Sequence, residues 1–269
     1  YSTCLTNLGG LYQRLNEYTK AEPLLKLALS LRGAQSENSA DYATSLNSLA
    51  NLYWVMGDYK RAEPHYLKAL AIRRKQYGEG HRSYASSLHN MAGLYLAMKD
   101  YAKAEPLYVQ AKEILKKELG ALHPDYATSL NNLAWLHQAT GKMEKAEPLF
   151  LEALRVRRKA LGKQHPDYAA SLNNMANLYK AKGEQGKAVR FYEEEIQILE
   201  NRLGVSHPDY GAALNNLANV YKGIGDYFKA EPFYFAALNT LKSGLDVSQS
   251  RLPAYSACVN NLANLYKTM

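Results

Sequence analysis

The stretch His123–Phe150, HPDYATSLNNLAWLHQATGKMEKAEPLF, decides the fold, because its first twelve letters return almost unchanged from His165 and from His207. Cutting the chain before each recurrent tyrosine gives six segments of 41 to 45 residues and a last one of 15 residues. A fixed period of this length indicates a repeat protein, in which each unit buries its apolar face against its neighbours. We therefore expect a single array over residues 1–269, with repeats at 1–41, 42–83, 84–125, 126–167, 168–209 and 210–254 and a half repeat at 255–269.

Each repeat is predicted to form two helices joined by a short break. In the first helix, Tyr126, Leu130 and Leu133 are spaced as one apolar face. In the second helix, Ala146 and Phe150 begin a similar pattern. Because glycine adopts the left-handed conformation without steric cost, we expect it to end the second helix in a left-handed C-cap. The glycines so placed are Gly78, Gly120, Gly162 and Gly204.

The second helix carries an early Glu-Pro pair in five of the six complete repeats, as in Glu147-Pro148. Proline has no N–H to close a helical turn, so we expect a slight bend or a loosened first turn there. The fifth repeat has Val189-Arg190 instead, and its second helix is expected to be straighter. The second helix should also run about two turns longer than in a 34-residue repeat.

These residues resemble a known family. Leu133-Ala134, Ala146, Phe150 and Ala153 stand where a tetratricopeptide repeat places its packing residues. The 42-residue period, the HPDY opening, the LNNLA segment and the AEPL segment are similar to the longer repeat of kinesin light chains and their bacterial relatives. The resemblance implies an all-α fold, a right-handed α-solenoid of stacked helix-turn-helix units that serves as a non-catalytic binding scaffold.

Composition indicates an ordinary soluble protein, with 47% hydrophobic and 22% charged residues. No apolar run approaches the roughly 18 to 20 residues that a membrane span requires, so no membrane partner is expected. Only two cysteines, Cys4 and Cys258, are present, which favours a reduced, cytoplasmic setting over a disulfide framework.

Because the chain starts on a repeat boundary without methionine and stops inside the seventh repeat, we expect it to be a fragment of a longer protein.

The His-Pro-Asp triplets, as at His123, could indicate a metal site or acid–base chemistry. One histidine and one aspartate per repeat make an incomplete site, and equivalent residues of stacked helices lie about 8–10 Å apart. Helix initiation explains them better, with proline at the first position, aspartate at the positive end of the dipole, and Asp41 and Ser83 as cap-type residues in the same place. We expect no catalytic residue, metal ligand or cofactor, and therefore no enzyme.

Basic runs end several of the second helices, and the net charge of the chain is +8. Cations suit the negative end of a helix dipole and a solvated surface. If successive repeats align them, they would instead form a basic edge that binds nucleic acid, which we keep as an alternative function. The runs are Arg73-Arg74-Lys75, Lys116-Lys117 and Arg157-Arg158-Lys159.

Asparagine recurs in the middle of the first helix although it is a poor helix former. It either bonds between neighbouring repeats and holds their register, or lines a groove and grips an extended peptide through its amides. Helical spacing places these residues with lysines and tryptophans on one strip of each first helix. The strip contains Trp54, Asn90, Asn131, Asn132, Trp135, Asn173, Asn174, Asn177, Lys180, Asn215, Asn216, Asn219, Lys222, Asn260, Asn261, Asn264 and Lys267.

The resemblance favours the groove, because kinesin light chain-like arrays hold short acidic or aromatic-plus-acidic peptides with asparagines and cations on the first helix. It implies that the ligand contacts are Asn132, Asn174, Asn216 and Asn261 with Lys180, Lys222 and Lys267. The expected partner is a peptide or protein segment with an apolar anchor and an acidic stretch. A structural spacer or assembly arm is a further alternative, and exposed Leu262 and Leu265 would allow end-to-end contacts between copies.

Overall fold

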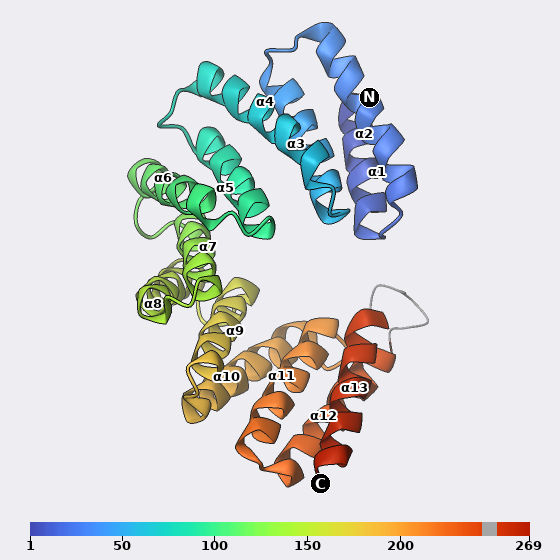
Figure 1. Cartoon of the computed structure of the whole chain (residues 1–269), viewed down its shortest axis with the longest axis vertical. Coiled ribbons are helices and arrows are strands. Elements are labelled where there is room, and N and C mark those ends of the chain that lie inside the picture. The colour runs from blue at the N-terminus through green and yellow to red at the C-terminus, as the bar shows by residue number, and fades with distance from the viewer. Residues whose placement is uncertain (244–251) are drawn as a thin grey trace. The chain divides into compact units, whose positions relative to one another are not determined.

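The computed structural model describes residues 1–243 and 252–269, and within these ranges it contains thirteen α-helices and no strand (Figure 1). The prediction of an all-α repeat fold is confirmed. The helices are α1 (Ser2–Arg14), α2 (Tyr18–Gln35), α3 (Ala40–Val55), α4 (Tyr59–Tyr77), α5 (Arg82–Ala97), α6 (Tyr101–Leu119), α7 (Pro124–Ala139), α8 (Met143–Leu161), α9 (Pro166–Ala181), α10 (Gln185–Leu203), α11 (Pro208–Ile224), α12 (Tyr227–Lys242) and α13 (Leu252–Thr268).

The chain divides into two compact units, Tyr1–Ala121 and Leu122–Met269. We call them the first unit and the second unit. In each of them every helix packs against the next, so that an odd-numbered A helix and the following B helix form one hairpin and successive hairpins stack as an α-solenoid. Each hairpin needs its neighbour because both of its helices carry more apolar surface than one partner can cover.

The apolar face predicted from the sequence forms the core of each hairpin. In α7, Tyr126 and Leu130 are buried, and in α8, Ala146, Phe150 and Ala153 are completely buried. Alanine at the second-helix positions lets the two backbones approach closely, while the aromatic ring fills the space beside them. The packing residues taken from the tetratricopeptide pattern therefore serve that purpose here.

Histidine, rather than aspartate, caps the A helices α7, α9 and α11 of the second unit. Nδ1 of His123 accepts a hydrogen bond from the backbone N–H of Asp125 at 3.1 Å, and His165 and His207 act in the same way at α9 and α11. The expectation that Asp41 and Ser83 are caps is wrong. Both lie inside their helices, and the capping residues are Ser39 and His81, since a cap must precede the first helical residue. From α3 to α11, each A helix is capped by the histidine or serine two positions before the expected residue.

The B helices are long, as expected, with 19 residues in α8. Pro148 is the sixth residue of α8 and thus lies in its second turn, and the helix is continuous through it. The prediction of a left-handed C-cap is wrong in detail. Gly162 has φ 85° and ψ 165°, an extended region that only glycine enters readily, because the chain must leave the helix in a straight segment toward the next repeat.

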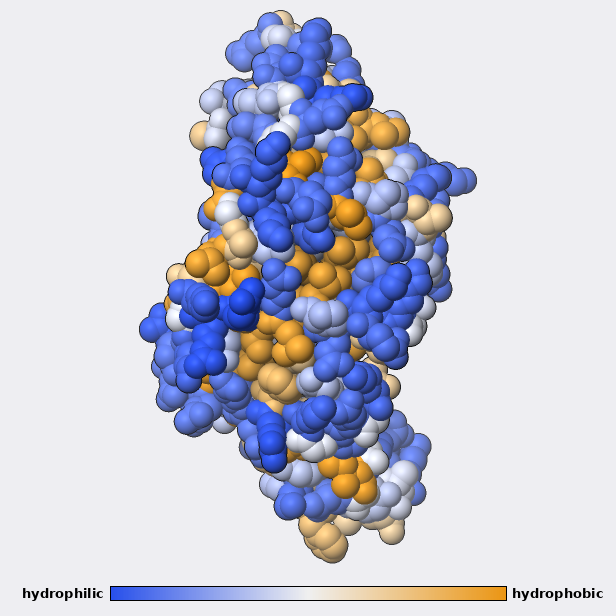
Figure 2. All heavy atoms as spheres, turned by 90° about the vertical axis from the view of Figure 1, so that its left-hand side faces the viewer, coloured by the Kyte–Doolittle hydropathy of each residue, from blue (hydrophilic) through white to orange (hydrophobic). Residues whose placement is uncertain are grey.

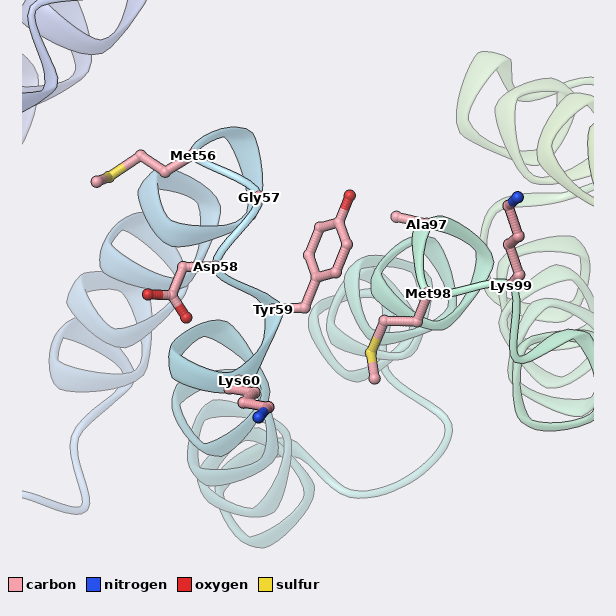
Figure 3. Close-up of a pocket in the computed structure, with 8 residues that line it drawn as sticks. All are labelled: Met56, Gly57, Asp58, Tyr59, Lys60, Ala97, Met98 and Lys99. Carbon is pink, nitrogen blue, oxygen red and sulfur yellow. The ribbon is translucent and has the colours of Figure 1, made fainter.

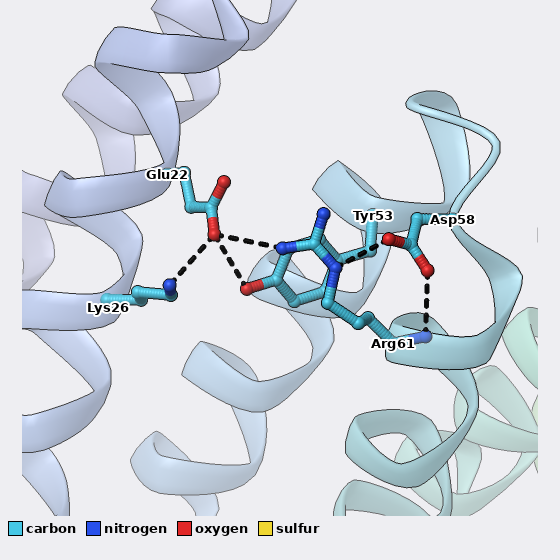
Figure 4. Close-up of polar contacts among 5 residues, drawn as sticks. All are labelled: Glu22, Lys26, Tyr53, Asp58 and Arg61. Atoms are coloured by element: carbon cyan, nitrogen blue, oxygen red, sulfur yellow. Dashed lines mark hydrogen bonds and ion pairs between the residues drawn. The ribbon is translucent and has the colours of Figure 1, made fainter.

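Glutamate of the Glu-Pro pair joins four of the B helices, α2, α4, α8 and α12, to the A helix that follows. Glu22 of α2 accepts hydrogen bonds from the Tyr53 hydroxyl of α3 at 3.0 Å and from Arg61 of α4 at 3.2 Å (Figure 4). Arg61 also stacks over the Tyr53 ring, 4.3 Å from its centroid, and pairs with Asp58. Because the bonded groups belong to different repeats, this joint fixes the register between them. It recurs as Glu63 with Tyr95, Glu147 with Tyr179 and Glu231 with Tyr266.

A buried arginine forms a second joint at the opposite end of the B helix. Arg157 of α8 donates to the Asp167 carbonyl at 3.1 Å, to Ser171 Oγ at 2.9 Å and to Thr128 Oγ1 at 3.1 Å. The first residue of the basic run at Arg157 therefore points into the joint with α9 and not into solvent. Arg32 and Arg73 occupy the same position and bond Ser45 and Ser87, whereas Leu115, Leu199 and Leu241 replace arginine in the other repeats.

Candidate functional site

The predicted asparagines separate into two groups in the structure. In the first group the side-chain oxygen accepts a hydrogen bond from a buried tyrosine of the same hairpin, at 2.7 Å between Tyr192 and Asn177 and also between Tyr234 and Asn219. Where α8 has Phe150 in place of tyrosine, Trp135 packs against its ring edge-on at 6.1 Å. The position shared by Trp135, Asn177 and Asn219 therefore contacts the B helix of its own hairpin. The two asparagine amides there hold the hairpin together.

The second group includes amides that form no side-chain hydrogen bond within residues 1–243 and 252–269. Asn90, Asn174 and Asn216 belong to it, and all three are half-buried. An amide half-withdrawn from water retains donors and acceptors that a bound peptide backbone can satisfy. Asn174 and Asn216 are therefore the predicted ligand contacts whose hydrogen-bonding capacity the described structure leaves available.

Other members of the strip serve packing or lie at the surface. Asn261 of α13 donates to Asn215 of α11 at 3.0 Å, so this one pair does join neighbouring repeats as the register interpretation requires. Asn131 is buried, and both Asn131 and Asn132 have interaction partners. Asn260 and Asn264 are exposed on α13. Trp54 and Trp135 expose 40% and 38% of their surface, so both aromatic rings are accessible.

Lysines lie at the C-terminal ends of the same A helices. Lys180 of α9 and Lys222 of α11 are half-buried, and Lys267 of α13 is exposed. None of the three forms an ion pair with any residue that the structure describes. Three unneutralised ammonium groups on successive A helices create a positive potential that attracts an anionic segment.

A cavity of about 310 Å³ opens between α9, α10 and α11 in the second unit. It brings together three predicted residues, Asn173, Asn174 and Asn216, and adds two carboxyl groups that were not predicted, Glu195 and Asp209. The remaining wall is apolar and small, formed by Pro166, Ala170, Leu199, Ala212 and Ala213.

Glu195 occupies a position that is alanine in the other five complete repeats. Its side chain is 94% buried (6% exposed), and Asn173 Nδ2 donates to its two carboxyl oxygens at 3.0 and 2.9 Å. Burial raises its pKa to about 8, the Asn173 hydrogen bond opposes this shift, and Asp209 adds to it. An alignment of the repeats places this one glutamate among alanines, so the sequence already marked Glu195 as unusual, and the sequence analysis missed it. The replaced alanines are Ala28, Ala69, Ala111, Ala153 and Ala237.

A second cavity, of about 710 Å³, lies between two helix-connecting turns of the first unit. Figure 3 shows the Tyr59 ring standing between these turns, with Ala97 and Met98 on one side and the Lys60 and Lys99 ammonium groups at the margins. It contains no asparagine of the strip. On the face drawn in Figure 2, apolar residues reach the surface between hydrophilic ones. The exposed apolar residues of the B helices include Leu67, Val109 and Leu151, which share one repeat position.

Neither metal sites nor membrane spans are found in the part of the chain that the structure describes. No three histidine, cysteine, aspartate or glutamate side chains there come together as a set of metal ligands. No helix within the described ranges combines the length and the apolar character required to cross a bilayer.

Comparison with known families agrees with this geometry. A tetratricopeptide repeat model matches residues 1–75, 41–117, 83–159 and 136–201, and a second tetratricopeptide repeat model matches residues 213–248. The chain belongs to the tetratricopeptide repeat family. No curated protein matches this tetratricopeptide array.

Solved structures of other tetratricopeptide arrays are similar to this one. A protein from Podosopora anserina assigned as a kinesin light chain, with nearly identical TPR-like repeats, is 27% identical with a TM-score of 0.66, over 76% of this chain and 96% of that chain. BtubC (BKLC) from P. vanneervenii has a TM-score of 0.68 at 23% identity, over 90% and 92%. Pseudomonas aeruginosa PilF has a TM-score of 0.58 at 21% identity, over 95% and 97%. The resemblance to kinesin light chain repeats is confirmed.

Proposed function

We propose that this array is a protein-interaction scaffold and that the A-helix face of the second unit binds a peptide segment of its partner. The observation that carries the proposal is the pair Asn174 and Asn216, whose amides have no side-chain partner among the described residues, beside the unneutralised Lys180 and Lys222. Extended peptides need backbone hydrogen bonds, and amides supply both donor and acceptor. The lysines add attraction for acidic side chains.

The joints between repeats support this assignment. At α8, register is held by a glutamate–tyrosine pair and an arginine–serine pair at the two ends of the helix. The hairpins are held by tyrosine–asparagine pairs such as Tyr192 with Asn177. Asn174 and Asn216 take part in none of these bonds. A mid-helix asparagine without a structural partner costs helix propensity, and ligand binding would explain that cost.

The competing proposals have weaker support. The basic edge that would bind nucleic acid cannot include Arg73 and Arg157, because both side chains point into the joints between repeats. End-to-end self-association was expected through exposed Leu262 and Leu265, but both side chains are buried, because α13 packs them against α12. Leu252, Val259 and Tyr266 are the large apolar residues that α13 exposes. We place the binding activity in the cytoplasm, since Cys4 and Cys258 are both free thiols.

Peptide display tests the proposal. A random peptide library is selected on the intact chain and then measured against a variant in which Asn174, Lys180, Asn216 and Lys222 are all changed to alanine. The selected peptides should bind the variant at least about tenfold more weakly, since several polar contacts are removed at once. Its melting temperature should stay close to that of the parent chain.

The matched control removes two lysines from a different surface. Lys145→Ala and Lys159→Ala, made together, change two exposed residues of α8. This control loses two positive charges, as the quadruple variant does. This control should keep its affinity for the peptides. Equal binding by the parent chain and the quadruple variant, with both folded, would refute the proposed groove.

A further inference from the structure

Glu195 is the exception at a B-helix position where every other complete repeat of this chain packs an alanine. Its position is filled elsewhere by alanine, whose side chain is 0–1% exposed and fits against the A helix. A glutamate there brings an ionisable carboxyl group into a nearly dry environment, where Asn173 is its one hydrogen-bond partner among the described residues. Ionised carboxylates are stable in such places only when a cation or several donors oppose them.

The cavity beside Glu195 has the chemistry of a cation site. Glu195 and Asp209 supply carboxyl oxygens, and Asn174 and Asn216 supply amide oxygens without a side-chain partner within the described ranges. The amide N–H groups of Asn173 are turned to Glu195, so this residue offers the cavity no donor. Guanidinium and ammonium groups are donors only, and therefore match the carboxyl and amide oxygens of this wall.

Size and wall chemistry agree with a single long side chain. About 310 Å³ lies at the lower end of the range for small-ligand cavities, roughly 300–1,000 Å³. The apolar part of the wall, including Pro166, Ala170 and Leu199, suits the methylene stem of lysine or arginine, which packs on apolar surface while its charged end is solvated elsewhere.

We infer that the Glu195 cavity receives a lysine or arginine side chain of the bound partner. The inference rests on the proposed function, because the peptide on the A-helix face supplies this side chain. It adds a basic residue to a ligand otherwise expected to be apolar and acidic. Glu195 of α10 and Asp209 of α11 face its charged end, and Lys180 and Lys222 lie farther along α9 and α11.

The arrangement also sets the spacing of charges in the partner. Lys180 follows Asn173 by seven residues of α9, a rise of about 10 Å along the helix. An extended chain covers that distance in about three residues. We therefore expect selected peptides to carry lysine or arginine about three positions from aspartate or glutamate.

The direct test uses small probes, so that it does not depend on finding a peptide. Methylguanidinium is titrated into the isotope-labelled intact chain, and the side-chain amide resonances of Asn173, Asn174 and Asn216 are followed by NMR. N-methylurea, of the same shape but neutral, is the control probe. Saturable shifts with methylguanidinium and none with N-methylurea are expected.

Two variants and pH complete the test. Glu195→Ala restores the residue of the other repeats, and Glu195→Gln keeps the shape without a negative charge; both should abolish the saturable shifts. In the parent chain, affinity should rise by up to about tenfold per pH unit below pH 8, because the cation binds the ionised carboxyl group. Shifts that persist in Glu195→Ala, or that occur equally with N-methylurea, would overturn the inference.

The outcome is separable from that of the proposed function. If selected peptides bind the A-helix face but keep their affinity when their basic residue is replaced by norleucine, the groove stands and the cation site fails. If methylguanidinium binds at Glu195 but no peptide depends on Asn174 and Lys180, the cation site stands and the peptide groove fails.

Discussion

The neighbouring hairpins α7–α8 and α9–α10 follow one template and differ at a few positions. In α8, Glu147 bonds Tyr179 at 2.8 Å and Arg157 bonds Ser171 at 2.9 Å, so two polar joints tie it to the next A helix. In α10 the glutamate of the Glu-Pro pair is replaced by Val189, and leucine stands in place of the arginine. Tyr221 reaches Glu193 instead, at 3.4 Å and at an exposed position.

The difference shows that the stable joint and the cavity occur at different places in the array. The α8–α9 joint is bonded at both ends, whereas the α10–α11 joint lacks both strong pairs and borders the cavity with Glu195. A buried carboxyl group in a weakly tied joint lowers stability, which packing alone would not favour. We take the fifth repeat to be specialised for binding and the fourth for holding the array together.

Removal of the buried Arg157 side chain should cause the largest loss of stability among the changes that test this comparison. Arg157→Ala removes the hydrogen bonds to Ser171, to Thr128 and to the Asp167 carbonyl, and we expect a loss of about 1–3 kcal/mol in the free energy of unfolding. Chemical denaturation measures it. Arg158→Ala, one residue further on and exposed, should change stability by less than about 0.5 kcal/mol. Equal losses in the two variants would show that the arginine joint is unimportant.

A smaller effect is expected from the tyrosine hydroxyls. Tyr179→Phe removes the hydrogen bond to Glu147 and should cost about 1 kcal/mol. Tyr221→Phe removes only the long, exposed contact with Glu193 and should cost much less. Thermal unfolding of both variants, under identical conditions, compares the two joints directly. A greater loss for Tyr221→Phe would reverse the proposed order of joint strength.

The sequence was sufficient to predict the helices, the repeat frame and the core, because each depends on a pattern that recurs every 42 residues. It was less informative where one residue type serves different purposes. Asn174 and Asn177 are alike in sequence, and only the position of the Tyr192 hydroxyl shows that Asn177 is bonded within the hairpin. Arg157, the first residue of its basic run, points inward because it donates a hydrogen bond to Ser171 of the next helix. Glu195 could have been found by comparing repeats, since its sister positions are all alanine.

The most direct test of this specialisation is the pH dependence of stability with and without Glu195. Burial raises the pKa of Glu195 from its usual 4.5 to about 8, so between these values the folded chain holds a proton that the unfolded chain releases. The contribution of Glu195 to stability must therefore fall as pH rises from about 4.5 to 8. Denaturation of the parent chain and of Glu195→Ala should be measured from pH 5 to pH 9. We predict that the variant is more stable and that its advantage grows with pH up to about 8. A constant difference across this range, or a less stable variant, would contradict the assignment of Glu195 as a destabilising acid kept for binding.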